Sequence, residues 1–259
     1  MPQLAKIDPS ADRAPFRQIA DILREGITSG QLAPGERLAP EAEMLEHFGV
    51  SRMTWRHALQ ELRTEGLVVS ARGIGVFVRE KAPVRRLSSD RFARRYRQEG
   101  DAAFSAEAKS TGFSAEVDTV VISREQPSAA IAGRLKLTGD AQVVVRSRRY
   151  LADGRPVQTA VSYIPVAFAE GTAIEQENSG PGGIYARLEE NGHLLGSFNE
   201  EVGARMPTPE ERQALDIEAG IPVLTVARTA YDTDGVPVEV CEHVMISDAY
   251  LLDYTFPAT

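Results

Sequence analysis

Apolar residues recur at three- and four-residue spacing through the first quarter of the chain, which is the pattern of amphipathic helices. The first stripe begins beside Pro15, a residue that the first turn of a helix accepts, and stops before Gly30. It consists of Phe16, Ile19, Ala20, Leu23 and Ile27. We therefore expect a first helix over about residues 16–27 that buries this stripe.

Two shorter helices and a hairpin are expected next. The second helix runs from about Pro40 to Gly49, a residue that can end a helix at positive φ. The third follows Ser51, a natural N-cap, and ends at Gly66. Residues 67–78 form two apolar strands around a glycine-bearing turn, which is typical of a β-hairpin.

Three helices with a tight turn between the second and third, followed by a hairpin, is the order of a winged helix-turn-helix. The outer face of the third helix would present Arg52, Met53, Arg56 and Gln60. Arginines there can reach guanine edges or phosphates in a major groove, whereas on an isolated helix they would form only a solvated face. The complete order of elements favours the DNA-binding interpretation.

Several neighbouring side chains add to this interpretation. Ser51 and Thr54 carry hydroxyls that can hydrogen-bond phosphate, and Arg72 at the hairpin tip suits a backbone or minor-groove contact. Trp55 stands between the outward-facing Thr54 and Arg56, so we expect it to be a buried packing residue.

From Phe104 onward the pattern changes to strands separated by Asp-Gly turns, and the region repeats itself. At an offset of 80, Pro127, Leu135, Leu137 and Val143 match Pro207, Leu215, Ile217 and Val223. After one inserted residue, Asp153-Gly154 matches Asp234-Gly235. Each copy predicts a helix, a strand, a turn and a returning strand. Together they imply an antiparallel sheet with pseudo-twofold character and helices on one face, an α+β domain.

A further helix is expected from Ile184 to Glu190. The glycine-rich run before it, residues 180–183, is either an anion-binding helix entry or an ordinary loop.

Charge is divided unevenly along the 259 residues. Residues 1–100 hold 17 Lys and Arg against 13 Asp and Glu, whereas residues 101–259 hold 12 against 24. This asymmetry favours a first region that tolerates polyanions, although a chance partition would also produce it. The most basic stretch, residues 85–97, contains Arg85, Arg86, Arg91, Arg94, Arg95 and Arg97. It either runs beside DNA phosphates as an extended linker or offsets acidic patches of the second region.

Composition suits a two-domain cytoplasmic protein. The chain is 42% hydrophobic and 25% charged, ordinary values for a soluble globular protein. The longest uncharged stretch, residues 156–169, is too short to cross a bilayer, and the first residues lack the apolar segment of a signal peptide. A single cysteine, Cys241, cannot form an internal disulfide.

The residues give little support to an enzyme. His193 and His243, the histidines of the second region, lack metal-ligand spacing to another His or Cys. Cys241 lacks the helix N-terminus that would activate a thiol, and no phosphate-loop, dinucleotide or nucleophile-elbow motif occurs. We therefore expect no catalytic residue, no metal site and no cofactor.

Residues 16–79 resemble the DNA-binding domain of GntR-type regulators. The matching residues include Gln18-Ile19-Ala20, Leu23-Arg24, Pro34-Gly35, Gly49-Val50-Ser51-Arg52, Thr54, Arg56, Ala58-Leu59, Glu65-Gly66-Leu67, Gly73, Gly75 and Phe77-Val78. The resemblance implies DNA contacts by Ser51, Arg52, Thr54, Arg56, Arg72 and Gly73. The chain departs from the family at Pro40-Glu41-Ala42, where a serine cap and an arginine that often contacts DNA are missing.

The region from about residue 100 to 257 resembles the UTRA effector-sensing domain of the HutC subfamily, which has a chorismate-lyase-like fold. The matching residues include Phe104-Ser105-Ala106-Glu107, Ser162-Tyr163-Ile164-Pro165, Ile184-Tyr185, Pro222-Val223-Leu224, Arg228 and Asp234 to Glu239. The resemblance implies a ligand cavity between the repeat halves, reached by Ser105, Arg148, Tyr163, Tyr185 and Glu239.

The chemistry of two of these residues leaves an alternative open. Arg148 could bind a carboxylate or phosphate, and Glu239 could accept from hydroxyl or amine groups, or the two could form a structural ion pair. Residues typical of the amino-sugar-sensing branch are absent near Ala160 and Met245, so a sugar-phosphate effector is not implied.

Together the patterns predict a two-domain α+β protein. A winged helix-turn-helix is expected at residues 14–80, a basic linker at 81–101, and a chorismate-lyase-like domain with an antiparallel sheet and helices at 102–259. The expected partners are a pseudo-palindromic double-stranded DNA operator, a second copy in a homodimer and a small-molecule effector, which could be anionic; no membrane partner is expected. Repression is implied by the resemblance. A regulator tuned only by its own concentration is the alternative to effector control.

Overall fold

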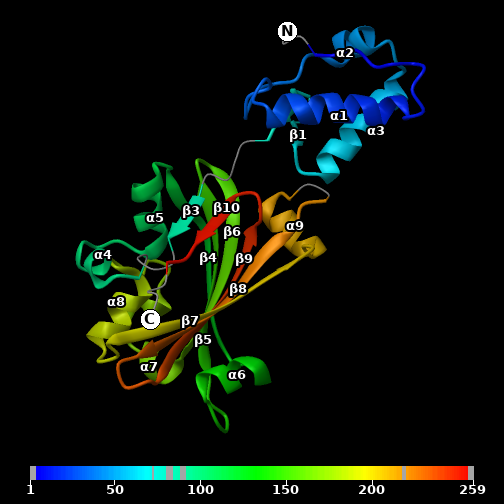
Figure 1. The fold of residues 1–259 in the computed structure, drawn as a ribbon. Helices are drawn as coiled ribbons and strands as arrows, with labels where there is room; N and C mark the ends of the chain where they lie inside the picture. Colours follow the sequence, from blue (N-terminus) through cyan, green and yellow to red (C-terminus); the bar gives the residue numbers. More distant parts are fainter. Residues whose placement is uncertain (1–3, 72, 80–83, 88–91, 218–219, 256–259) are drawn as a thin grey trace. The chain divides into compact units, whose positions relative to one another are not determined.

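The computed structural model describes residues 4–71, 73–79, 84–87, 92–217 and 220–255. The chain divides into two compact units, residues 1–81 with 218–221 and residues 82–217 with 222–259. The first unit is mainly helical and the second is built on one large twisted sheet (Figure 1). Among the helices described, none combines the length and hydrophobicity that a membrane span requires.

Three helices form the first unit where the apolar stripes predict them. They are α1 (Pro15–Thr28), α2 (Glu41–Phe48) and α3 (Arg52–Thr64). Gly49 ends α2 at a φ of 64°, a conformation that favours glycine. Ser51 caps α3 by accepting a hydrogen bond of 3.2 Å from the Thr54 amide. At Pro40, by contrast, α2 begins without a side-chain cap, as the missing serine predicts.

A two-stranded wing completes the first unit. Strands β1 (Val68–Ala71) and β2 (Gly75–Val78) pair antiparallel. The core draws on all three helices and the hairpin, and includes Ile19, Leu23, Leu32, Met44, Phe48, Leu59, Leu62, Val68 and Val78. Trp55 is only 2% exposed and stacks on Phe48. This confirms the prediction that Trp55 is a packing residue.

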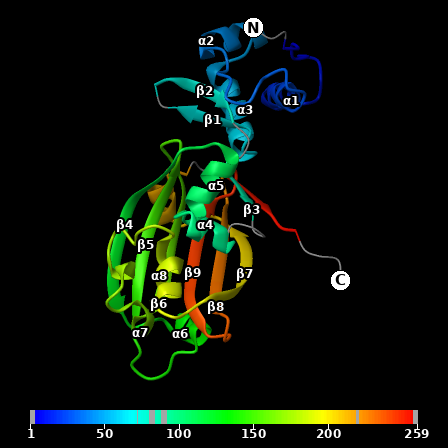
Figure 2. The same ribbon diagram turned by 90° about the vertical axis from the view of Figure 1, so that its left-hand side faces the viewer.

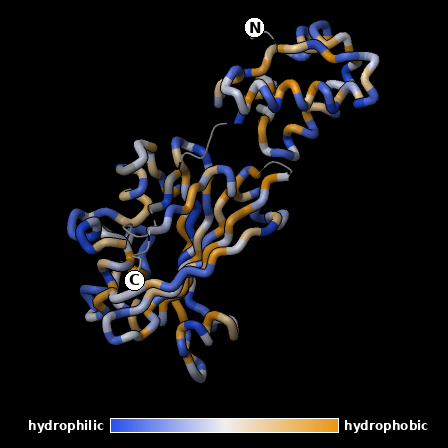
Figure 3. Tube along the Cα trace, viewed as in Figure 1, coloured by the Kyte–Doolittle hydropathy of each residue, from blue (hydrophilic) through white to orange (hydrophobic). Residues whose placement is uncertain are grey.

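Six antiparallel strands form the sheet of the second unit, in the order β4-β5-β6-β9-β8-β7. They are β4 (Ala115–Glu125), β5 (Val143–Ala152), β6 (Arg155–Pro165), β7 (Leu195–Arg205), β8 (Val223–Asp232) and β9 (Pro237–Ile246). Apolar positions recur along these strands (Figure 3). Asp153 and Gly154 both have positive φ, which suits the tight turn between β5 and β6.

The strand order confirms the sequence repeat. Strands β4, β5 and β6 correspond to β7, β8 and β9, and the sheet has the same order from either edge. Tyr163 pairs with Val240, and Thr159 pairs with Val244. In the repeat, Thr159 corresponds to Val240 and Tyr163 corresponds to Val244. Exchanging the two repeats therefore converts one pair into the other, as a twofold axis requires. The sheet therefore has a pseudo-twofold axis between β6 and β9.

Helices cover both faces of this sheet, which corrects the expectation of helices on one face. They are α4 (Arg94–Gln98), α5 (Ala103–Thr111), α6 (Ala129–Leu135), α7 (Val166–Ala169), α8 (Gly183–Glu190) and α9 (Pro209–Leu215), with the 3-10 turn η1 (Ala173–Glu175). Helices α4, α5 and α8 lie on one face, and α6 and α9 on the other (Figures 1 and 2). Val143 and Val145 pack with α6 while Val144 packs with α8. Both faces of β5 are apolar, so both must be covered.

Two segments differ from the sequence expectation. Phe104, expected where the strands begin, lies in α5, because the alanine-rich sequence there favours a helix. The stretch expected as a linker contains α4 and also β3 (Val84–Leu87), which pairs in parallel with β10 (Tyr250–Asp253). Val84 and Arg86 are fully buried. This basic segment is therefore built into the second unit.

Candidate functional site

The outer face of α3 is the first candidate site. Its exposed residues are Arg52, Met53, Arg56, His57 and Gln60. The Arg52 side chain is 71% exposed, and its Nε lies 2.8 Å from a carboxylate oxygen of Glu41 at the start of α2. This ion pair positions the guanidinium beside the first turn of α3 and leaves it open to solvent. The helix thus presents cations outward, as its periodicity predicts.

The other residues expected to contact DNA surround this face. The hydroxyls of Ser51 and Thr54 lie 3.0 Å apart at the start of α3. Gly73 is exposed in the wing and has a φ of 76°. Arg72 lies outside the described residues. The structure thus gathers the predicted Ser51, Arg52, Thr54 and Arg56 on the first two turns of α3.

A groove of about 640 Å³ between α3 and β2 adds cations that the sequence analysis did not identify. Arg37 and Arg63 line it together with Arg56. A β-carbon on Gly75 would lie 2.7 Å from Nε of Arg37, so glycine leaves room for that side chain beside the wing. Arg63 donates a hydrogen bond to Ser70 in β1. Arg37 precedes α2 in sequence, and no periodicity could have linked it to α3.

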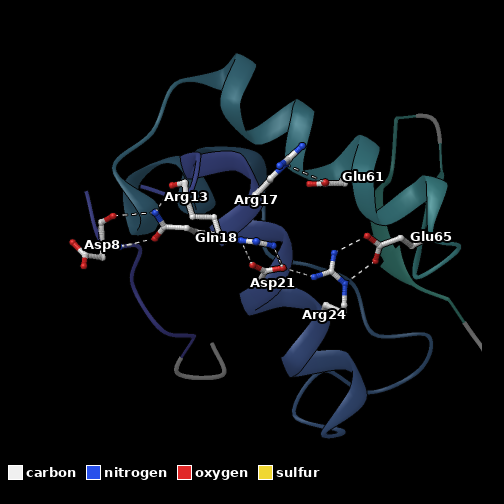
Figure 4. Close-up of polar contacts among 8 residues, drawn as sticks. All are labelled: Asp8, Arg13, Arg17, Gln18, Asp21, Arg24, Glu61 and Glu65. Atoms are coloured by element: carbon white, nitrogen blue, oxygen red, sulfur yellow. Dashed lines mark hydrogen bonds and ion pairs between the residues drawn. The ribbon is translucent and has the colours of Figure 1, made fainter. Parts of the chain in front are cut away.

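Other arginines of the first unit are paired between α1 and α3. Arg24 binds Glu65 with an N–O distance of 2.6 Å, and Arg17 lies 3.8 Å from Glu61 (Figure 4). These carboxylates neutralise cations on α1 and lie apart from Arg52 and Arg56 along α3. The basic residues exposed on the first two turns of α3 are therefore distinct from this acidic contact with α1.

The second candidate site is a cavity of about 460 Å³ in the second unit. The N-terminal ends of α5 and α8 and the inner face of the sheet line it. Its polar lining residues include Ser105, Arg146, Arg148, Gln158, Tyr185, Arg228, Glu239 and His243. Four of the five residues expected to contact an effector, Ser105, Arg148, Tyr185 and Glu239, are therefore brought together in one cavity.

Glu239 is the centre of the hydrogen bonding in this cavity, and its side chain is only 1% exposed. Tyr185 donates its hydroxyl to Oε2 at 2.5 Å, and Ser162 donates its hydroxyl to Oε1 at 2.6 Å. Burial raises the pKa of Tyr185 well above its usual value, so this phenol stays a neutral donor. Each carboxylate oxygen also keeps acceptor capacity for a further group.

Arg148 and Glu239 are joined through a hydroxyl rather than as a direct ion pair. Arg148 donates to Oγ of Ser162, which in turn donates to Glu239. Burial opposes the charge of Arg148, but the facing Tyr150 and Glu239 keep its pKa above the usual value. Arg148 therefore remains a cation with donors at the cavity wall.

Arg146 lies in the same wall of the cavity but binds backbone carbonyls. Its guanidinium donates to the carbonyls of Ile174, Gln176 and Glu177. Burial and the neighbouring Arg148 lower its pKa to about 10. Arg146 thus fixes the loop after η1, part of which lines the cavity.

Arg228 of β8 also lines the cavity. Its Nη2 is 3.7 Å from Oε2 of Glu239. Burial opposes its charge, but Tyr185, Cys241 and Glu239 hold its pKa above the usual value. Arg228 is among the residues that match the family, but the resemblance implies no role for it. The repeat could have indicated one, because Arg228 stands 80 residues after Arg148.

Tyr163, expected to reach the cavity, lies on the opposite face of the sheet. It packs with Ile131 and Leu135 of α6, and its hydroxyl is 3.4 Å from Glu242. Successive residues of a strand point to opposite faces. Because Ser162 faces the cavity, its neighbour Tyr163 must face away from it.

Cys241 is a buried thiol beside these polar groups, 3.3 Å from Oγ of Ser162. Burial, with Glu239 nearby, raises the pKa of this thiol. Within the part of the chain that the structure describes, no cluster of three His, Cys, Asp or Glu side chains is arranged to hold a metal ion.

Two family models match the chain. The model described as bacterial regulatory proteins of the gntR family matches residues 15–78, and the model of the UTRA domain matches residues 110–250. The two matches coincide with the helical first unit and the sheet of the second.

Relatives of similar length share both parts. An uncharacterised HTH-type transcriptional regulator of Streptomyces coelicolor is 34% identical over 95% of this chain and 94% of its own. The HTH-type transcriptional repressor NagR of Bacillus subtilis is 30% identical over 91% of each chain. The crystal structure of a GntR-family transcriptional regulator, 29% identical, covers 96% of this chain and 99% of its own with a TM-score of 0.62.

Another solved structure supports the fold. PhnF from Mycobacterium smegmatis, 23% identical, covers 93% of this chain and 100% of its own with a TM-score of 0.60. The chain therefore belongs to the GntR family of bacterial regulatory proteins, as a HutC-type transcriptional regulator with a helix-turn-helix DNA-binding domain and a UTRA effector-sensing domain.

Proposed function

We propose that this regulator is a repressor that binds a pseudo-palindromic operator as a homodimer and is released or retained by a small anionic effector. The repressor NagR, which is similar over nearly the whole chain, supports the sign of regulation. Two copies related by a twofold axis would each place one α3 in successive major grooves, which explains the symmetry expected of the operator.

In this proposal the first two turns of α3 read the operator. Arg52 and Arg56 reach base edges or phosphates, while Ser51 and Thr54 bind phosphate oxygens. Arg52 exchanges its contact with Glu41 for DNA. The exposed Gly73 permits close approach of the wing to the sugar-phosphate backbone, and Arg37 extends the basic surface beside it.

The cavity of about 460 Å³ is the observation that supports an effector site. Its volume lies in the range of small-molecule sites. Arg148 and Arg228 provide enclosed positive charge, and residues at the N-terminal ends of α5 and α8 bring the positive ends of two helix dipoles to the same space. A carboxylate or phosphate group fits these donors, and Glu239 with Gln158 suits hydroxyl or amine groups of the same ligand.

An effector would act by binding one conformation of the dimer more tightly than another. Such a ligand shifts the population between states that bind the operator and states that do not. A regulator tuned only by its concentration would have no need of an enclosed basic cavity, so effector control is the better-supported alternative.

Recovery of genomic DNA bound by the full-length chain tests the DNA half of the proposal. We expect one enriched inverted repeat, and sedimentation of the protein with that duplex should show two chains per duplex. Recovered fragments without a shared motif would contradict operator recognition, and one chain per duplex would contradict the homodimer.

Thermal unfolding with added anions tests the effector half. Inorganic phosphate, phosphate monoesters and small carboxylates should include compounds that raise the midpoint, because a ligand of the folded state stabilises it. The same compounds should have little effect on Arg148→Ala. A panel in which none discriminates the two proteins would contradict an anionic effector in this cavity.

A further inference from the structure

The pseudo-twofold axis gives the cavity wall a counterpart in the second repeat. In the first repeat, Val120 of β4 pairs with Arg148 of β5. At the equivalent place in the second repeat, Glu200 of β7 pairs with Arg228 of β8. The two half-sites thus share an arginine at the same position and differ in its cross-strand neighbour, a valine in one and a carboxylate in the other.

The second half-site is occupied by the chain itself. Arg86 of β3 is completely buried and donates to Glu200, and its Nη1 lies 3.3 Å from Sδ of Met245. Phe92 stacks on Phe198 of β7, with ring centroids 4.2 Å apart. A cation and an aromatic ring from the segment before α4 therefore fill the space that corresponds to the effector cavity.

Glu200 is the polar anchor of this occupant. Its side chain is only 9% exposed, and its second oxygen accepts a 3.0 Å hydrogen bond from the hydroxyl of Tyr254. Strands β3 and β10 pair with each other. Glu200 therefore binds both strands of this pair, through Arg86 of β3 and through Tyr254, the residue after β10. A valine at this position, as in the first repeat, could bind neither Arg86 nor Tyr254.

Arg228 connects the occupied half-site to the effector cavity. One of its nitrogens lies 3.9 Å from Glu200 and another lies 3.7 Å from Glu239. Its guanidinium also lies over the rings of Phe92 and Tyr185, at 4.7 and 5.7 Å from their centroids. One buried cation therefore contacts both the cavity and the segment that follows the DNA-binding unit in sequence.

We propose that Glu200 and Arg228 form a latch that holds β3 and Phe92 in the second half-site, Glu200 through Arg86 and Arg228 through the Phe92 ring, and that an anion in the cavity loosens this latch by drawing Arg228 away from Phe92. The competition rests on the proposed effector function; the latch itself does not. Because β3 begins only three residues after residue 81, where the first segment of the DNA-binding unit ends, its docking is one covalent route by which the cavity can act on DNA binding. By linkage, the factor by which the anion weakens the docking of β3 equals the factor by which undocking of β3 strengthens anion binding.

Hydrogen exchange of the full-length chain tests the latch. In Glu200→Val and in the isosteric Glu200→Gln, amide exchange in β3 should accelerate about 10-fold or more, as expected when a hydrogen bond to a charged group is lost. Exchange in β5 and β6 should stay unchanged, which shows that the sheet is folded. If Glu200→Val does not fold, Glu200→Gln decides the question.

Glu201→Gln is the matched control. Glu201 is the next residue of β7, faces away from the half-site and binds Arg134 at 2.7 Å with 61% of its side chain exposed. This variant also loses an arginine partner, but β3 exchange should remain at the wild-type rate. Equal β3 exchange in the Glu200 and Glu201 variants would overturn the latch.

Inorganic phosphate tests the competition in the same experiment. In the wild type, phosphate should protect amides of residues 102–105 and 182–185 and accelerate β3 exchange, and Glu200→Gln should bind phosphate about 5-fold more tightly. Protection of the cavity with unchanged β3 exchange would overturn the competition while leaving the effector proposal intact. Absence of protection would overturn both the anionic cavity and the competition, and the latch would still be decided by the variants.

Discussion

Arginines on α3 of the first unit and on the inner face of the sheet in the second unit have opposite surroundings. The Arg52 side chain is 71% exposed and has one carboxylate partner at the edge of α2. Arg228 is only 5% exposed and lies among Glu200, Glu239, Phe92 and Tyr185. One cation is placed on a surface, and the other is enclosed with its counter-charges already arranged.

The surroundings of these arginines determine what each unit can bind. Exposed arginines can contact a long polyanion, and their attraction is screened by salt. Enclosed arginines are screened much less and have room only for a ligand that fits the cavity.

Removal of two exposed arginines should have the largest effect. In Arg52→Ala/Arg56→Ala, affinity for the recovered operator should fall about 1,000-fold, because two bidentate base contacts contribute roughly 4 kcal/mol together. Fluorescence anisotropy with the labelled duplex measures this loss. Arg17→Ala removes another exposed arginine, which pairs with Glu61, and should retain operator affinity. An equal loss of affinity in both variants would show that α3 is not the surface that recognises the operator.

Removal of a buried arginine should instead affect the fold. Arg86→Met leaves the buried Glu200 without its nearest cation and should lower the free energy of unfolding by about 3 kcal/mol. Arg24→Met, which breaks ion pairs with Asp21 and Glu65 whose side chains are all about one-third exposed, should cost only about 1 kcal/mol. Urea unfolding of both variants measures the difference, and similar costs would refute the contrast between the two environments.

Salt should separate the two kinds of binding. Raising monovalent salt from 50 to 200 mM should weaken operator binding about 100-fold, the loss expected when about four phosphates are contacted. Phosphate binding in the cavity, followed by calorimetry, should change only a few-fold over the same range. An operator affinity insensitive to salt would contradict engagement of phosphates by the exposed cations.

A neighbouring pair on β5 tests the enclosed cations directly. Arg148→Ala should weaken phosphate binding about 30-fold, since a charge-assisted hydrogen bond contributes roughly 2 kcal/mol. Arg149→Ala is the control, because Arg149 points to the other face of the sheet and binds Asp118. Calorimetric titration should show wild-type affinity for it, and an equal loss in both variants would point to general electrostatics instead.

The smallest effect is expected from pH at the surface of the first unit. Burial raises the pKa of Asp21, but hydrogen bonds from Arg13 and Arg24 outweigh it and hold this pKa below the ordinary value of 3.8. The ionised Asp21 carboxylate therefore stabilises the folded state fully above pH 3.8, and this stabilisation is lost as the pH falls through the lowered pKa. Between pH 5 and 3, the free energy of unfolding measured in urea should fall slightly less for Arg24→Met than for the wild type. A larger fall for the variant would contradict this pairing.

The first unit could be predicted almost entirely from the sequence because its signals are local. Helical spacing identified the buried stripe, Ser51 and Gly49 marked helix ends, and Trp55 was recognised as core from its neighbours. Arg37 was missed because its approach to Gly75 depends on how the wing folds back beside α3.

The second unit was predictable only in outline. The repeat revealed the hairpins and the pseudo-twofold sheet, and four of the expected residues do line one cavity. The family resemblance implied that Tyr163 reaches the cavity, but Tyr163 lies on the other face of the sheet. The pattern could not have corrected this, because both faces of these strands are apolar. The basic stretch that includes Arg86 was expected as a linker whose arginines either run beside DNA or offset acidic patches of the second region. The ion pair of Arg86 with Glu200 supports the second alternative, but composition could not identify a partner that stands 114 residues away in sequence.

By itself, the sequence determined the three helices of the first unit, where those helices end, and that the second unit is a duplicated hairpin sheet. These features depend on periodicity and capping over a few residues. Only the tertiary structure decided which half of the duplicate stays open and which is filled by Arg86 and Phe92. That outcome depends on side chains from distant segments meeting across a sheet, where one change from valine to glutamate alters what the site can hold.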